Sequence, residues 1–160
     1  MNKVFDVKTI AMNAMIACVY AVLTIAIAPI AYGGIQMRIS EIMIFLAFYN
    51  KKYIPGLVVG CFIANMASPM GIWDMCFGTI ATVLACIAMY QTKYLLIGAL
   101  SGGMINGLIV GAELYFAMEL PFIINAFYVF IGEFAVLIVG AVLFKLLEKN
   151  DSLMSKYIYE

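Results

Sequence analysis

Histidine is absent from this 160-residue chain, so the commonest metal ligand and general base are both missing. Charged side chains make up only 11% of the residues, whereas a typical soluble domain has about a quarter. No glycine-rich loop of the kind that cradles nucleotide phosphates is present, so we do not expect the chain to bind ATP by itself. These absences argue against a soluble enzyme and against an ATPase.

Paired cysteine motifs are absent too. The four cysteines, Cys18, Cys61, Cys76 and Cys86, all lie within apolar runs and share no regular spacing. This pattern favours small residues that pack between helices over a disulfide framework or a metal site. We therefore expect no cofactor and no metal ion, and we expect no nucleic acid among the partners.

Hydrophobic residues, in contrast, form 66% of the chain, which is typical of a protein embedded in a lipid bilayer. The start does not resemble a cleaved signal, because its apolar run is too long and lacks a small-residue cleavage site. The sequence predicts an all-α fold of six transmembrane helices in a single integral membrane domain, residues 1–160. The expected helices cover approximately residues 9–28, 38–50, 54–67, 72–90, 94–118 and 122–147.

The lysines are distributed unevenly over this predicted topology. With six spans, every lysine falls on the side that also holds both termini, namely Lys3, Lys8, Lys51, Lys52, Lys93, Lys145, Lys149 and Lys156. Positive residues mark the cytoplasmic side of membrane proteins. The sequence therefore predicts cytoplasmic N- and C-termini in a multi-pass membrane protein, with Arg38 alone on the outer side.

Four polar residues flank two apolar runs near the middle of the chain. Arg38 and Glu41 precede the first run, and Asn65 and Asp74 follow the second. A polar corner at residues 50–52 reverses the chain between the two runs, so all four side chains should meet on one side of the membrane. An Arg38–Glu41 salt bridge at a helix end is an equally acceptable interpretation of that i,i+3 pair.

Three further polar residues lie inside the last two predicted helices. Glu113 and Glu133 are ionisable groups within spans, where they are costly and normally face the interior for a functional reason. Asn106 lies seven residues before Glu113 and so shares its helix face. The sequence thus predicts an outward-facing cavity with an excess of carboxylates.

Such a cavity suits a cation or a ligand with several N–H donors. Trp73 beside Asp74, with Tyr32, Tyr115 and Phe116 at similar depth, could offer stacking surfaces for a planar heterocycle that carries amine groups. The tyrosines could instead form an interfacial belt, and Glu119 is expected to be simply solvated.

Small residues form a stripe on the first predicted helix, at Ala14, Ala17 and Ala21. Small residues allow another helix to approach closely in lipid. The neighbour could be a helix of the same bundle or a separate subunit, and the sequence leaves both possibilities open.

The segments IQMRISE and KYIPGLVVGCFIANMASPMGIWDMCFGTIAT, with Ala17-x-x-x-Ala21, resemble the QueT family of queuosine-precursor transporters. These are substrate-binding S components of energy-coupling factor (ECF) transporters. The resemblance implies a six-helix fold that binds a 7-deazaguanine such as preQ1 from outside. It also implies docking on a membrane coupling subunit driven by two ATPases, with the alanine stripe as the docking motif. Glu41, Asn65 and Asp74 are motif positions, and the loops 31–37 and 68–71 resemble lids.

Other functions remain open on the sequence. The chain could be an S component for another vitamin-like ligand. It could also be an intramembrane proton or cation conductor that uses Glu113 and Glu133 as relay sites. A membrane enzyme is the least supported alternative, because no nucleophile–base pair or metal-ligand spacing is present.

Overall fold

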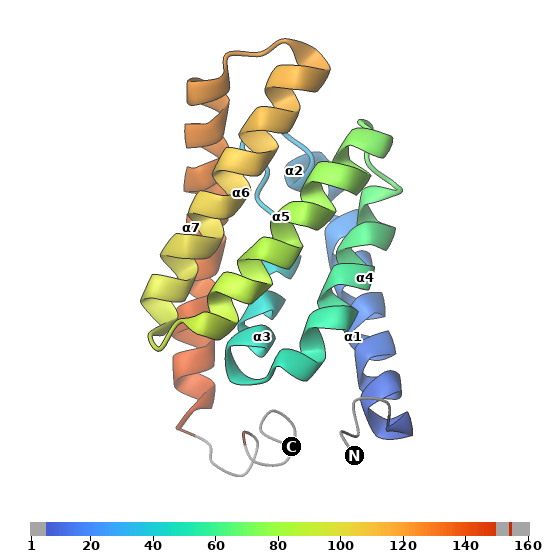
Figure 1. The fold of residues 1–160 in the computed structure, drawn as a ribbon, viewed down its shortest axis with the longest axis vertical. Helices are drawn as coiled ribbons and strands as arrows, with labels where there is room; N and C mark the ends of the chain where they lie inside the picture. The colour runs from blue at the N-terminus through green and yellow to red at the C-terminus, as the bar shows by residue number, and fades with distance from the viewer. Residues whose placement is uncertain (1–5, 150–153, 155–160) are drawn as a thin grey trace.

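The computed structural model describes residues 6–149 and Met154, and within these residues it is helical without any strand (Figure 1). The elements in chain order are α1 (Val7–Ala26), α2 (Ala28–Ala31), the 3₁₀-helix η1 (Ile39–Ile44), α3 (Phe45–Tyr49), the 3₁₀-helix η2 (Lys51–Tyr53), α4 (Ile54–Asn65), α5 (Ile72–Gln91), α6 (Leu95–Met118) and α7 (Phe122–Leu147).

Successive segments run in alternating directions along the bundle (Figure 1). The start of α1, the η2 turn, the α5–α6 turn and the end of α7 all lie at its lower end, which we call the lysine end. The described lysines all belong to this end: Lys8, Lys51, Lys52, Lys93, Lys145 and Lys149. Lys3, Lys156 and the two chain termini lie outside the described residues.

Four helices are long and apolar enough to cross a membrane, namely α1, α5, α6 and α7. The other two segments that run along the bundle, η1–α3 and α4, are shorter than the six-span prediction requires. At 1.5 Å per residue, the 12 residues of α4 extend only about 18 Å, against about 30 Å for the hydrocarbon core of a bilayer. The described chain is therefore an all-α, multi-pass membrane protein with four candidate spans.

Two predicted helices differ in kind from the observed ones, and the helix expected over 54–67 differs only in ending at Asn65. The helix expected over 9–28 ends at Ala26, and Pro29 occupies the first turn of the separate helix α2. The helix expected over 38–50 is a 3₁₀-helix that continues into the short α3. A 3₁₀-helix aligns residues three apart on one face. Glu41 and Ile44 are both fully buried, and the tighter winding places them on the same inward face.

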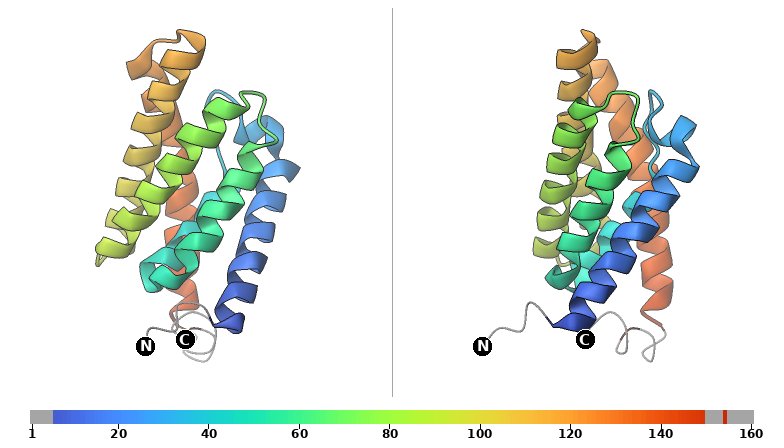
Figure 2. Two further views of the ribbon diagram at one scale, coloured as in Figure 1. Left: turned by 45° about the vertical axis from the view of Figure 1, so that its right-hand side comes forward. Right: turned by 90° about the vertical axis from the view of Figure 1, so that its right-hand side faces the viewer.

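The broken segment η1–α3 lies inside the bundle (Figure 2), where it contacts α1, α5 and α7. Irregular backbone is tolerated at membrane depth only where protein covers it. Below η1, toward the lysine end, the core is apolar and includes Phe45, Leu57, Met89 and Leu137. The fold therefore holds the polar start of η1 above an apolar core.

Close helix contacts fix this arrangement at two glycine positions. A Cβ at Gly111 of α6 would lie 2.6 Å from the Cβ of Ala126 on α7, so these helices touch backbone to backbone. Similarly, a Cβ at Gly60 of α4 would lie 2.9 Å from the Cα of Ala17 on α1.

The alanine stripe of α1 is largely used within the chain. Ala17 and Ala21 are buried, and Ala17 packs against Gly60 of α4. Ala14 alone among the three is exposed. Of the two interpretations that the sequence left open, the burial of Ala17 and Ala21 favours packing within the bundle, and docking of the stripe on a separate subunit stays a prediction.

Candidate functional site

A cluster of polar side chains occupies the middle of the bundle, and no member exposes more than 4% of its surface. It draws residues from four helices, from η1 and from the residue that precedes η1. The members are Arg38, Glu41, Asn65, Asp74, Asn106, Glu113 and Glu133. These are seven of the eight substrate-site residues that the sequence predicts.

Arg38 is the single cation of this cluster. Its Nη2 atom lies 3.3 Å from Oδ1 of Asp74 and 3.5 Å from Oε1 of Gln36, to both of which it donates. Its guanidinium lies 5.5 Å from the ring centre of Tyr32, within cation–π range. The Arg38–Glu41 salt bridge considered from the sequence is not among these contacts. Arg38 instead joins the start of η1 to α5.

Glu41 is held by hydroxyl groups. Tyr20 of α1 donates to Oε1 of Glu41, and Thr82 of α5 donates to the same oxygen at 3.4 Å. Asn106 lies beside Glu41 without a hydrogen bond of normal geometry. Next to Glu41, the hydroxyls of Ser40 and Thr24 lie 2.6 Å apart. These contacts anchor the 3₁₀ segment to the neighbouring helices.

Asn65 ends α4 and ties it to α5. Its Nδ2 atom donates to the backbone carbonyl of Asp74 at 2.8 Å and to the sulfur of Cys61 at 3.4 Å. Gly78 of α5 faces this amide, and a Cβ there would lie 2.6 Å from Nδ2 of Asn65 and 3.3 Å from Nη1 of Arg38. A residue without a side chain is thus required at position 78.

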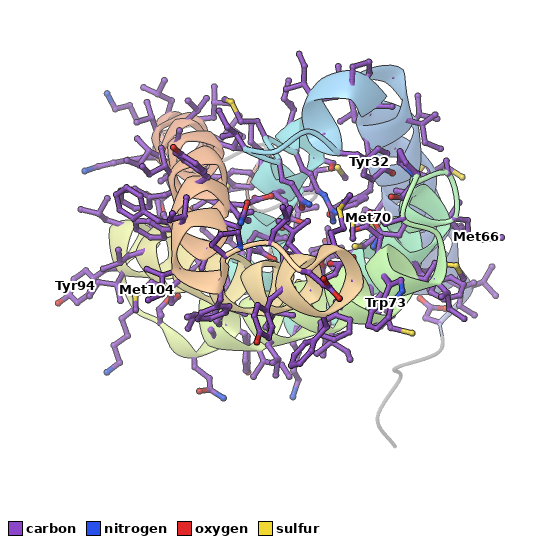
Figure 3. All side chains as sticks on the ribbon, turned by 90° about the horizontal axis from the view of Figure 1, so that it is seen from above. Tyr32, Met66, Met70, Trp73, Tyr94 and Met104 are labelled. Atoms are coloured by element: carbon purple, nitrogen blue, oxygen red, sulfur yellow. The ribbon has the colours of Figure 1, made fainter. Side chains whose placement is uncertain are left out.

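The loop between α4 and α5 completes the environment of Asp74. Ser68 donates its hydroxyl to Oδ2 of Asp74, and the backbone N–H of Met70 donates to the Ser68 hydroxyl at 3.1 Å. Seen from above, Tyr32 and Met70 lie over the middle of the bundle (Figure 3). This loop therefore covers the polar cluster from the end opposite the lysines.

The loop between α2 and η1 covers the cluster from the other side. The carbonyl of Ile35 packs directly on Gly132 of α7, the residue before Glu133, where any Cβ would collide with it. Gln36 is buried and has a φ of 50°, a backbone conformation that residues other than glycine rarely adopt. Tyr32 donates to the carbonyl of Ala64 at 2.5 Å. Partial burial raises the pKa of the Tyr32 phenol, although Arg38 acts against this.

Many polar atoms of the cluster have no hydrogen-bond partner within the described residues. The acceptors are Oε2 of Glu41, Oδ1 of Asn65, both carboxylate oxygens of Glu113 and Oε2 of Glu133. The donors are Nε of Arg38 and Nδ2 of Asn106. Glu113 lies near Asp74, and Glu133 lies near Glu41, so the negative charges of each pair repel one another. Arg38 attracts both glutamates. Buried polar atoms are nearly always paired, so this concentration of unpaired ones marks the cluster as the candidate site.

Trp73 does not join the cluster. It is 40% exposed, packs against Phe77 at a ring-centre distance of 5.8 Å, and lies toward the outer edge of the bundle (Figure 3). Tyr115 and Phe116 are also exposed, whereas Tyr32 contacts Arg38. Trp73 thus lies outside the cluster of buried polar side chains, and its role as a stacking surface for a ligand stays a prediction.

The sequence analysis missed the neutral side chains that hold the charged ones. They are Tyr20, Gln36, Ser68 and Thr82. Isolated hydroxyls within apolar runs carry little signal by themselves. One usable signal was helical spacing on α5, since Asp74, Gly78 and Thr82 lie four residues apart and share one face.

These features define a class of protein: a polytopic α-helical membrane protein that encloses a polar, acid-rich site between its helices. The QueT transporter family model matches residues 10–149, and the chain belongs to this family. The chain is 32% identical to the queuosine precursor transporter QueT of Lactococcus lactis subsp. cremoris (strain MG1363), an alignment that covers 95% of this chain and 97% of the relative. No solved structure matches the chain with statistical significance. The family and this relative are transporters and not enzymes.

Proposed function

We propose that the chain is the substrate-binding membrane subunit of an ECF-type importer and that its ligand is a queuosine precursor, a 7-deazaguanine with preQ1 as the expected form. Membership of the QueT family and the name of the Lactococcus relative support the substrate class. The unpaired polar atoms of the buried cluster are the observation that links this ligand to particular residues.

The chemistry of the cluster complements preQ1. Five unpaired acceptor oxygens and two unpaired donor groups call for a ligand with more N–H donors than acceptors. PreQ1 offers the N–H groups of a guanine-like edge, a ring carbonyl and a primary ammonium. One carboxylate takes the paired N–H groups of the edge, Arg38 or an Asn meets the carbonyl, and a second carboxylate holds the ammonium.

Charge leads to the same ligand. Arg38 faces four carboxyl groups in the cluster, those of Glu41, Asp74, Glu113 and Glu133. If all ionise, three negative charges lack a protein counterion in a region where isolated charge is costly. A cationic ligand reduces this imbalance, and a neutral heterocycle of the same shape does not.

Entry of the ligand requires a movement, because the cluster is buried. The loops 32–38 and 66–71 close it at the end opposite the lysines. We propose that these loops act as lids and that the ligand enters from outside. The six alternating passes would then all be membrane-embedded, and the positive-inside rule would place the lysine end and both termini in the cytoplasm of a prokaryotic plasma membrane.

Delivery of the ligand inward would depend on partners. In the proposed assembly the chain docks on a membrane coupling subunit that two cytoplasmic ATPases drive, which fits the lack of a phosphate-binding loop in this chain. With Ala17 and Ala21 buried, docking through α1 would use its exposed face, which includes Ala14.

A proton or cation conductor is less compatible with the structure. The core between the site and the lysine end is apolar, with Phe45, Leu57, Met89 and Leu137 fully buried, so no polar path continues from Glu133 through the described core. Purified chain in liposomes should show no proton or cation flux above that of empty vesicles.

The direct test is ligand binding by the purified full chain in detergent. PreQ1 should bind at a single site and raise the melting temperature, because a ligand at 100 times its Kd adds about 2.7 kcal/mol of stability. Guanine and riboflavin, tested in parallel, should have no comparable effect. Stabilisation by riboflavin or another vitamin-sized heterocycle, but not by preQ1, would disprove the proposed substrate.

A further inference from the structure

A second cavity lies at the lysine end, outside the polar cluster, between α3, the start of α6 and the end of α7. Its volume is about 430 Å³. The α5–α6 turn and the end of α7 contribute lining residues, and both lie at the lower end of the bundle (Figure 1). Its polar rim consists of Lys93, Lys145 and Glu148, and its apolar wall includes Leu96, Ile138 and Val142.

The rim carries two ammonium groups and one carboxylate, so it is net positive when all three ionise. Neither Lys93 nor Lys145 forms an ion pair within the part of the chain that the structure describes. Glu148 accepts a hydrogen bond from the Tyr49 hydroxyl at 3.0 Å. The rim is therefore complementary to an anion, with one hydrogen-bond acceptor at its side.

The wall of the cavity faces lipid. Leu96 and Val142 are 63% and 55% exposed on helices that are candidate membrane spans, so the apolar part is continuous with the lipid-facing surface. Lys93 lies just before the start of α6 and Lys145 lies in the last turn of α7, which is the level of the lipid headgroups. An anion that is also anchored by a long apolar chain satisfies both parts of the cavity, and a small water-soluble phosphate satisfies only the rim.

We propose that this cavity binds an anionic glycerophospholipid. Its phosphate lies between the ammonium groups of Lys93 and Lys145, and one acyl chain follows Leu96, Ile138 and Val142 along α6 and α7. A hydroxyl-bearing headgroup donates a hydrogen bond to Glu148. Basic pockets between helices at the membrane surface have the chemistry for such lipids.

The test uses the purified full chain and native mass spectrometry, with palmitoyl-oleoyl phosphatidylglycerol and phosphatidylcholine as probes. The wild type should retain phosphatidylglycerol in preference to phosphatidylcholine. Lys93→Gln or Lys145→Gln should weaken phosphatidylglycerol binding about fivefold each, and the double variant about thirtyfold. Lys51→Gln is the control, because it removes a lysine from the same end but outside the cavity.

A second pair of variants tests the acyl-chain part. Val142→Phe narrows the cavity and should reduce lipid retention, whereas Val139→Phe adds the same bulk to α7 outside the lining and should not. Unchanged melting temperatures without lipid establish that the variants fold.

Three results would overturn the proposal. The first is equal retention of the two lipids by the wild type. The second is an equal loss of binding in Lys51→Gln and in the rim variants, which would indicate general surface charge. The third is a cross-link from a photoreactive residue at position 142 to another polypeptide instead of to lipid, which would assign the groove to a protein partner.

Discussion

Replacement of Glu113 by Gln should show whether the site recognises the positive charge of the ligand in addition to its shape. Glu113 is fully buried, and neither of its carboxylate oxygens has a hydrogen-bond partner within the described residues. Glu133 has one such oxygen. Gln keeps the volume and one acceptor but removes the negative charge, so the variant changes electrostatics with little change in packing.

The expected magnitude follows from the hydrogen bonds that are changed. A hydrogen bond to a charged group contributes about 1.5–3 kcal/mol, so loss of the ammonium–carboxylate contact should weaken preQ1 binding about 10- to 150-fold. PreQ0 carries a neutral nitrile in place of the aminomethyl group. Its affinity should change less than about threefold in Glu113→Gln, because no charged contact is lost.

Titration calorimetry with both ligands on the purified variants provides the measurement. Glu133→Gln should show the same selectivity with a smaller loss, since fewer of its oxygens are unpaired. Glu119→Gln is the matched control: it removes a carboxylate of the same helix end, but an exposed one. Equal loss for preQ1 and preQ0 in both buried variants would refute the assignment of a charge-reading carboxylate.

Three other substitutions test how the site is built. Asp74→Asn weakens the charge-assisted hydrogen bonds that Arg38 and Ser68 donate to this side chain and should destabilise the fold by about 1.5–3 kcal/mol, measured as a lower midpoint of thermal unfolding; an unchanged midpoint would contradict that pairing. Gly132→Ala places a methyl group against the carbonyl of Ile35 and should displace the covering loop, which faster proteolysis of that loop in the ligand-free protein would reveal. Trp73→Phe should leave preQ1 affinity unchanged within twofold, because the ring lies outside the cluster; a loss above tenfold would return Trp73 to the site.

The sequence predicts most of the helical segments because long apolar runs have few alternatives in a bilayer. It does not predict the break at residues 38–49, because a short apolar stretch with polar residues at one end suits a regular helix equally well. The 3₁₀ winding depends on tertiary contacts. Tyr20 and Thr82 hold Glu41, and the hydroxyl of Ser40 pairs with Thr24, all from helices distant in sequence.

The polar cluster is predictable for its charged members and not for the side chains that hold them. Glu113 and Glu133 stand out, since a carboxylate within a span demands an explanation. Tyr20 and Ser68 do not stand out, because an isolated hydroxyl in an apolar run or a loop is ordinary. Trp73 differs from its neighbour Asp74 in a predictable way: adjacent residues on a helix lie about 100° apart, so Asp74 faces inward and Trp73 is exposed.

The half-length segment at the centre of the bundle explains why charged groups can gather at this depth. If 38–49 were a full span, its charged start would lie at the membrane surface, where water would solvate Arg38 and Glu41. Because the segment is short and enclosed by α1, α5 and α7, its start lies inside the bundle beside Asp74. Arg38 then stabilises carboxylates that α5, α6 and α7 could not bury alone. One broken segment thus creates both the polar site and the need for loops that cover it.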